Sequence, residues 1–245
     1  MKGMLRAEWL KLRTTRAFYG LIAGAVGVAA LGGFSTVASA QAKSLSGPLH
    51  EQTFWVLASI NIGLFALILG IRAYTEEYRH RTIVHTLFAD PRRRRSAAAK
   101  AVVSALAAMV LAAVAVAAMI GIALLMASAK GGAIAPDSSD VAAVGGLLGA
   151  SALWAALGVG FGALVRHQVP AIVGGLVWIL VIENLGAGFL GSGGSYLPGQ
   201  TAHSLARATE MGDLLAVPVA AAVLGGYALL LWAAGVAATR RRDIA

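Results

Sequence analysis

The residues best placed to do chemistry lie in one polar segment, Arg72–Lys100, which reads RAYTEEYRHRTIVHTLFADPRRRRSAAAK. The acid pair Glu76-Glu77 lies near its start and the arginine run Arg92–Arg95 near its end. Pro91 interrupts the segment, because the residue before a proline disfavours the α region. Apolar side chains recur between these charges at helical spacing: Ile83, Val84, Leu87 and Phe88. Such a stripe predicts a helix that docks on another protein or on a membrane. A solvated loop whose arginines only set membrane orientation is the alternative.

Glu183 is the one acidic residue next to a long apolar run, VWILVIENLGAGFL. At about 1.5 Å per residue, a helix that begins near Pro170 places Glu183 roughly 20 Å along its axis, between the midplane of a membrane and one interface. An ionisable residue at that depth is a candidate for a transport pathway. Gly186 and Gly188 instead favour a helix that ends near Asn184 and leaves the carboxylate in water.

Several common catalytic motifs are missing from the sequence. It contains no G-x-x-x-x-G-K-[ST] phosphate cradle, no H-E-x-x-H and no cysteine. The five histidines are scattered, and His80 and His85 are spaced poorly for one metal on one helical face. Ser192 and Ser195 lie in a glycine-rich stretch without a paired base, which makes a nucleophile there a weak hypothesis. We therefore predict no catalytic residue, no metal ligand and no cofactor on this chain.

The composition predicts an all-α integral membrane protein. The 245 residues are 58% hydrophobic and 13% charged, whereas soluble proteins are about 45–50% apolar and about 25% charged. The excess falls in runs close to the roughly 20 residues that cross a bilayer, and without strand alternation they must be helices. The predicted transmembrane helices of this single domain, 1–245, are 17–40, 54–71, 101–129, 141–165, 169–190 and 214–239. Gly158 and Gly162, like Gly20 and Gly24, have the spacing of close helix contacts.

The placement of the 20 Lys and Arg residues predicts the topology. Seventeen of them lie in four clusters, Lys2–Arg16, Arg72–Lys100, Arg166 and Arg240–Arg242, and six crossings bring all four to one side. The positive-inside rule makes that side cytoplasmic, together with both termini. The loop 72–100 is then cytoplasmic, and the segment 191–213 is an external loop with a short helix expected over 202–211.

The net charge of +9 requires a separate explanation, because a basic protein can bind nucleic acid. Here the charge flanks apolar runs and forms no continuous face, so it is explained by membrane insertion. We predict a multi-pass protein of the bacterial inner (plasma) membrane that contacts the lipid bilayer and no nucleic acid.

Residues 1–16 predict an amphipathic helix that lies in the plane of the membrane interface. Apolar side chains recur every three or four residues: Met1, Met4, Leu5, Trp9 and Leu12. Arg6, Lys11 and Arg13 occupy the remaining positions, where they would meet anionic headgroups. An ordinary basic lead-in to the first crossing is the alternative.

Two motifs resemble the ABC-2 family of transporter permeases. On the loop after the second crossing, E-x-R-x-x-T begins at Glu77 and P-x-x-x-R-x-x-x-x-K runs from Pro91 to Lys100. The N-terminal stretch RAEWLKLR, Arg6–Arg13, is similar to the family's N-terminal motif, as is the six-crossing plan with a larger external loop before the last helix. Arg81 departs from the pattern, because relatives often have glycine there.

The resemblance implies a role for each motif. Residues 1–16 correspond to the family's elbow helix, with Arg6, Trp9, Lys11 and Arg13 at the membrane interface. The loop 72–100 carries a coupling helix that contacts a cytoplasmic ATPase subunit, which binds the ATP. The expected contact residues are Glu76, Glu77, Arg79, Arg81, Thr82, Leu87, Pro91 and Arg95.

The implied function is that of a permease subunit, not itself an enzyme. Two permeases, identical or different, would work with two ATPases. Together they would export a small amphipathic compound, drug, lipid or peptide by alternating access, with Glu183 as a candidate pathway residue. The alternatives are a membrane-embedded enzyme that uses Glu183 and the outer loop, and a non-catalytic membrane anchor or assembly factor.

Overall fold

The computed structural model describes residues 2–39, 53–80, 93–207 and 215–241, and the described chain is helical. The helices are α1 (Lys2–Thr14), α2 (Arg16–Ser39), α3 (Thr53–Arg79), α5 (Arg93–Ala129), α6 (Ser138–Val165), α7 (Gln168–Val177), α8 (Glu183–Leu190), α9 (Pro198–Leu205) and α10 (Val217–Arg241). A π-helical turn, Trp178–Ile182, joins α7 to α8. Within the described residues, six helical stretches are long and apolar enough to cross a membrane, as predicted.

The second and third crossings extend further than the sequence predicted. α3 continues to Arg79 and α5 begins at Arg93, so both ends of the predicted loop 72–100 are helical. Arg72 pairs with Glu76 one turn later along α3, and alanines 97–99 favour helix at the start of α5. Lys100 therefore lies inside α5 instead of opening it.

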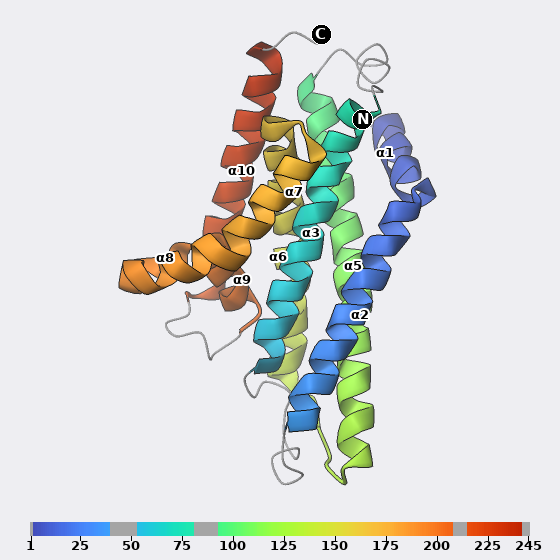
Figure 1. Cartoon of the computed structure of the whole chain (residues 1–245), viewed down its shortest axis with the longest axis vertical. Helices are drawn as coiled ribbons and strands as arrows, with labels where there is room; N and C mark the ends of the chain where they lie inside the picture. The colour runs from blue at the N-terminus through green and yellow to red at the C-terminus, as the bar shows by residue number, and fades with distance from the viewer. Residues whose placement is uncertain (1, 40–52, 81–92, 208–214, 242–245) are drawn as a thin grey trace.

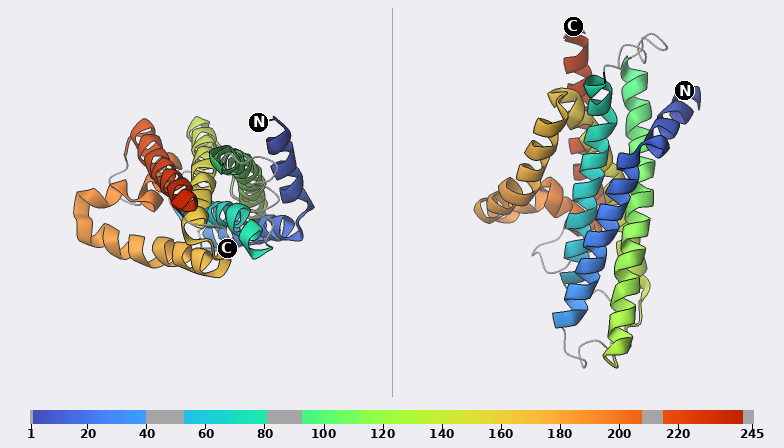
Figure 2. Two further views of the ribbon diagram at one scale, coloured as in Figure 1. Left: turned by 90° about the horizontal axis from the view of Figure 1, so that it is seen from above. Right: turned by 45° about the vertical axis from the view of Figure 1, so that its right-hand side comes forward.

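The bundle is built around α3 and α6 (Figures 1 and 2). α2 and α5 cover one side of this pair, with α1 packed on α5, and α7, α9 and α10 lie on the other. Backbones approach closely at the centre: a Cβ at Gly70 would lie 2.0 Å from the carbonyl oxygen of Ala155, and one at Gly158 would lie 2.4 Å from that of Leu67. Gly158 thus makes the close contact that its spacing predicted, whereas a Cβ at Gly20 would meet none of the described atoms within 4 Å.

The start of α1 and the end of α10 lie at the same end of the bundle, which we call the terminal face (Figure 1). At the opposite end, α6 begins with a capping box in which Asp137 accepts from the backbone N–H of Asp140. α6 ends at Val165, and the next residue, Arg166, has a positive φ of 63° that turns the chain into α7. Because both ends of the described chain lie at the terminal face, an even number of crossings separates them.

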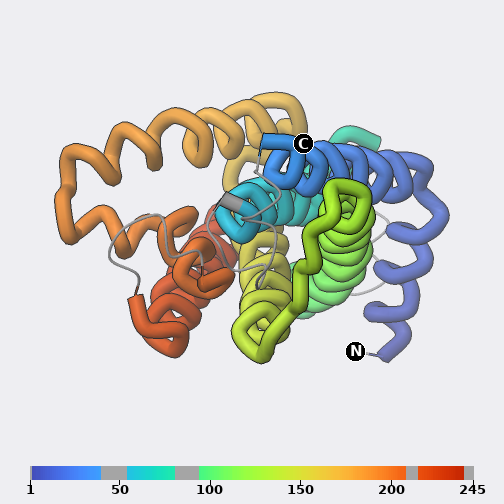
Figure 3. Tube along the Cα trace, turned by 90° about the horizontal axis from the view of Figure 1, so that it is seen from below, coloured from blue at the N-terminus to red at the C-terminus, as the bar shows by residue number. Residues whose placement is uncertain are grey.

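The described part of the segment 191–213, residues 191–207, contains a turn and a short helix. After α8 the chain makes a 3₁₀ turn, Gly191–Tyr196, and α9 folds back onto α3, α6 and α10 (Figures 1 and 3). The helix predicted over 202–211 instead spans Pro198–Leu205, because proline favours the first helical position. Most of α9 is buried against the bundle.

Single cysteines can test the topology, since the natural chain has none. Arg95→Cys lies at the start of α5, and Ala135→Cys lies in the turn between α5 and α6 at the other end. We expect a membrane-impermeant maleimide to label Ala135→Cys in intact cells and Arg95→Cys only after permeabilisation, because the clustered cations stay inside. Labelling of both residues in intact cells would contradict this orientation.

Candidate functional site

Four charged side chains form a closed ring near the terminal face. Lys11 Nζ lies 3.0 Å from Glu8 Oε1 and 2.7 Å from Glu77 Oε1. Lys100 Nζ lies 2.9 Å from Glu8 Oε2 and 2.7 Å from the same Glu77 Oε1. Each cation thus contacts both anions, and the ring joins α1, α3 and α5. We call these four residues the ion ring.

The helices put these charges together in a simple way. Glu8 and Lys11 are three residues apart, so they share one face of α1. Glu77 lies in the last turn of α3, and Lys100 lies two turns into α5. Glu8, Glu77 and Lys100 are buried, with 7%, 5% and 1% of their surfaces exposed. Buried charges are costly unless each has a partner, and the equal numbers of cations and anions supply one for each.

Lys11 is the member of the ring nearest water, with about half of its side chain exposed. Burial alone would lower the pKa of Lys11, but the hydrogen bond to Glu77 and the charges of Glu8 and Glu77 outweigh it. The pKa of Lys11 is therefore raised, and its ammonium stays charged at physiological pH.

This geometry changes the interpretation of two predicted site residues. Glu77 was expected to contact a partner directly, but its carboxylate faces into the bundle and is bonded to Lys11 and Lys100. Lys11 was expected among lipid headgroups, but its ammonium bonds Glu8 and Glu77. The sequence motifs did not single out Glu8, although its position three residues before Lys11 was a usable signal.

The other predicted residues lie around the ring. Arg79 is exposed at the end of α3, where its Nη1 donates to Gln168 Oε1 at 3.1 Å, and Arg95 is exposed at the start of α5. Glu76 is half-buried against Arg72. Arg6, Trp9 and Arg13 are exposed on α1, which is a helix as predicted. The remaining predicted contacts, Arg81, Thr82, Leu87 and Pro91, lie outside the described residues.

The ion ring predicts that Lys100→Met destabilises the protein by about 3 kcal/mol or more, because it leaves two buried carboxylates with one cation. The added change Glu77→Gln should recover part of that loss, since Glu8 and Lys11 then remain as a balanced pair. Thermal unfolding in detergent measures both effects. The matched control is Arg95→Met, a similar truncation at an exposed cation of the same helix. Equal melting temperatures for Lys100→Met and the control would contradict the ring's structural role.

A second polar site surrounds Glu183, at the junction of the π-helical turn and α8. The helix continues to Leu190, and only 3% of Glu183 is exposed, so the expectation of a helix end and a wet carboxylate was wrong. The carboxylate accepts the Gly199 N–H, at 3.0 and 2.8 Å from its two oxygens, and the indole N–H of Trp178 at 3.0 Å. It thereby caps the start of α9, where no neighbouring side chain does so.

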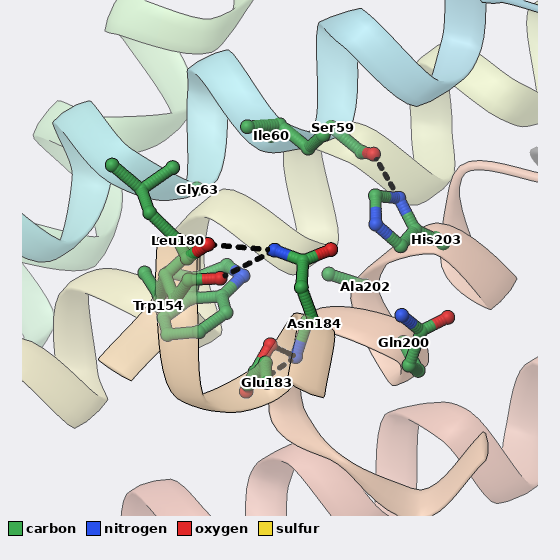
Figure 4. A pocket seen from close by; sticks show the side chains of 12 residues that line it. Ser59, Ile60, Gly63, Trp154, Leu180, Glu183, Asn184, Gln200, Ala202 and His203 are labelled. Atoms are coloured by element: carbon green, nitrogen blue, oxygen red, sulfur yellow. Dashed lines mark hydrogen bonds between the residues drawn. The ribbon is translucent and has the colours of Figure 1, made fainter. Parts of the chain in front are cut away.

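Other side chains complete this site, which Figure 4 shows. Asn184 Nδ2 donates to the carbonyl oxygens of Ile179 and Leu180 in the π-helical turn. Ser59 Oγ of α3 lies 2.5 Å from His203 Nδ1 of α9. Burial lowers the pKa of His203 to about 4, so the imidazole is neutral at physiological pH.

The cavity between these residues has a volume of about 40 Å³. That is room for two or three water molecules, and it is far below the roughly 300 Å³ at which ligand pockets begin. Among the described residues, no group of His, Cys, Asp and Glu could hold a metal ion. The site is therefore a bracket that fixes α9 to α8 and α3. Sequence reasoning missed Gly199 and His203, because the fold-back of α9 has no motif.

The Glu183 bracket predicts different results for two substitutions. Glu183→Leu leaves the Gly199 N–H without its acceptor, at a cost of about 1–3 kcal/mol, and should lower the melting temperature and speed proteolysis near α9. Glu183→Gln retains an acceptor oxygen of the same shape and should stay close to the wild type. If the two variants behave alike, the capping role of Glu183 is wrong.

Comparison with known families gives one informative result. A family model described as ABC-2 family transporter protein matches residues 4–184. The match includes the ion ring and Glu183 and ends before α9 and α10. None of the curated proteins compared with the chain is similar enough to match it.

Proposed function

Because the chain belongs to the ABC-2 family of transporter proteins, we propose that it is the permease subunit of an ATP-driven exporter, with ATP bound and hydrolysed on separate subunits. Its family and its six membrane-crossing helices make it a transporter permease. The ion ring is the observation that supports an ATP-driven permease, because it joins the three helices that border the predicted ATPase contact.

The ion ring holds together the helices on either side of the proposed ATPase contact. The segment 81–92 connects α3 to α5, and the ring ties these two helices to each other and to α1. Arg79 and Arg95 stand exposed at the two helix ends that flank the segment. A partner that pushes on the segment would displace α1, α3 and α5 together. We assign direct ATPase contact to the exposed charges and a positioning role to Glu77.

α3 is the element through which such a displacement would pass across the membrane. Its 27 residues make a rod of about 40 Å. Glu77 lies in the ion ring at one end, and Ser59 meets His203 of α9 near the other. Between them, Gly70 brings α3 into backbone contact with α6. Movement of α3 would therefore shift α6 and α9 and change which side of the membrane has access to the pathway.

The proposed assembly contains a second permease, identical or different, and two ATPases. Large apolar side chains are exposed on α2, including Val28, Leu31 and Phe34, and can face lipid or the second permease. The helix walls are apolar with few fixed charges, which suits a small amphipathic compound, drug, lipid or peptide as the exported substrate. The bacterial inner membrane is the proposed location.

The alternative of a membrane-embedded enzyme gains no support from Glu183. Both of its carboxylate oxygens accept the Gly199 N–H, and the adjoining cavity of about 40 Å³ is too small for a substrate. The ion ring likewise gives no reason to favour a non-catalytic anchor. We therefore retain the permease function alone.

Charge reversal at Arg79 tests the ATPase contact. Arg79→Glu should lower both co-purification of the ATPase and export by about tenfold or more, because like charges across an interface cost several kcal/mol. Membrane insertion, measured by cysteine labelling at Ala135→Cys, should not change. Quantitative co-purification and transport in vesicles give the readouts.

The matched control is Arg207→Glu, since Arg207 is also exposed but follows α9, away from the ion ring. It should leave ATPase binding unchanged. Full ATPase binding by Arg79→Glu, or equal losses in the two variants, would contradict the proposed contact.

A further inference from the structure

A cavity of about 300 Å³ opens beside the ion ring, between α1, α3 and α5. It is several times larger than the cavity at Glu183, and its volume is at the lower end for ligand sites. One part of its wall is charged and includes Lys11, Glu76 and Lys100. The rest includes apolar side chains such as Leu12 and Val103. The cavity therefore suits a molecule with both polar and apolar parts.

Ser104 provides an independent sign that this cavity holds a ligand. It lines the cavity one turn after Lys100 on α5 and is fully buried. Among the residues that the structure describes, its hydroxyl has no hydrogen-bond partner. Other buried helical hydroxyls donate to a backbone carbonyl, as Ser151 does to Leu148 and Thr75 does to Ile71. A buried hydroxyl without a partner is costly, so an oxygen-bearing ligand would satisfy it.

A second hollow continues from the cavity along α2 and α3. It has a volume of about 40 Å³ and shares Leu12, Thr15, Ala73 and Glu76 with the larger cavity. Beyond these shared residues its wall is largely apolar, with Phe18, Leu21 and Leu69. The route therefore leads from charges near the terminal face to apolar side chains deeper along the crossings. A membrane lipid has the same order of headgroup and acyl chain.

The charged residues that line the two hollows indicate which kind of lipid headgroup would bind there. Of the described residues that line them, three cations, Lys11, Arg72 and Lys100, face three carboxylates, Glu8, Glu76 and Glu77, so these charges balance. A balanced wall disfavours a headgroup with a net charge and suits one that carries both signs. None of the described residues that line the larger cavity is Phe, Tyr or Trp, the side chains that recognise a quaternary ammonium. A primary ammonium, which donates hydrogen bonds, suits the site better.

From these observations we propose that the two hollows form a binding site for one phosphatidylethanolamine molecule of the leaflet at the terminal face. Its phosphate accepts from Ser104 and the half-exposed Lys11. Its ammonium donates to Glu76, and the start of one acyl chain lies beside Phe18 and Leu69. The bound lipid joins α1 to α3 next to the ion ring. This site depends on membrane insertion and is independent of the ATPase contact.

The test uses the whole chain, purified in mild detergent and incubated with an equimolar mixture of phosphatidylethanolamine, phosphatidylcholine and phosphatidylglycerol with identical acyl chains. Native mass spectrometry counts the lipids that stay bound. We expect about one phosphatidylethanolamine per chain. Ser104→Ala should weaken its retention by roughly fivefold, the effect of one hydrogen bond. Ala73→Leu, which fills the junction of the hollows, should abolish retention.

Two matched variants separate lipid binding from folding. Ser151→Ala removes a buried hydroxyl on α6, and Ala113→Leu enlarges an exposed alanine on α5. Both should retain the lipid as the wild type does, and thermal unfolding should show all four variants folded. If Ala73→Leu fails to fold, Ser104→Ala decides. Equal retention of the three lipids, a preference for phosphatidylglycerol, or retention unchanged by Ser104→Ala would overturn the proposal.

Discussion

The fold depends on a closed ring of four charges, three of them buried, near one end of an otherwise apolar bundle. Each ion of the ring would be costly alone, and the four are tolerated because every cation contacts both anions. The ring also fixes geometry. A slide of α1 by one helical turn, about 5.4 Å, would separate Glu8 and Lys11 from both of their long-range partners. α1 is thus held in one register against α3 and α5.

The other helices of the bundle are positioned through their contacts with α3, which the ring holds in place. α3 leaves the ring, meets α6 through glycine at Gly70 and Gly158, and reaches Ser59 beside α9. At that end Glu183 caps α9 and ties it to α8. The helix α3 therefore joins two polar sites at different depths, the ion ring and the Glu183 bracket, and apolar side chains pack between them.

The sequence predicted the crossings well, because long apolar runs and clustered cations report directly on membrane insertion. It could not separate inward from outward charges in the segment after the second crossing. Glu77 and Arg79 are two residues apart, which on a helix turns them about 200° from one another, so one enters the ring and the other faces outward. Glu183 was misjudged because glycine is tolerated in transmembrane helices, and Gly199 was missed because a backbone N–H has no sequence signature.

The same helical geometry explains how one short segment can hold two kinds of charge. The inward residues, Glu77 and Lys100, bond to each other, and they also bond to Lys11 and Glu8, respectively. The outward residues, Arg79 and Arg95, are exposed at helix ends whose positions the ring sets. A force applied at those ends cannot be absorbed by sliding α1, because sliding breaks the ring. In the proposed exporter, such a force would therefore move α3 and α5 together.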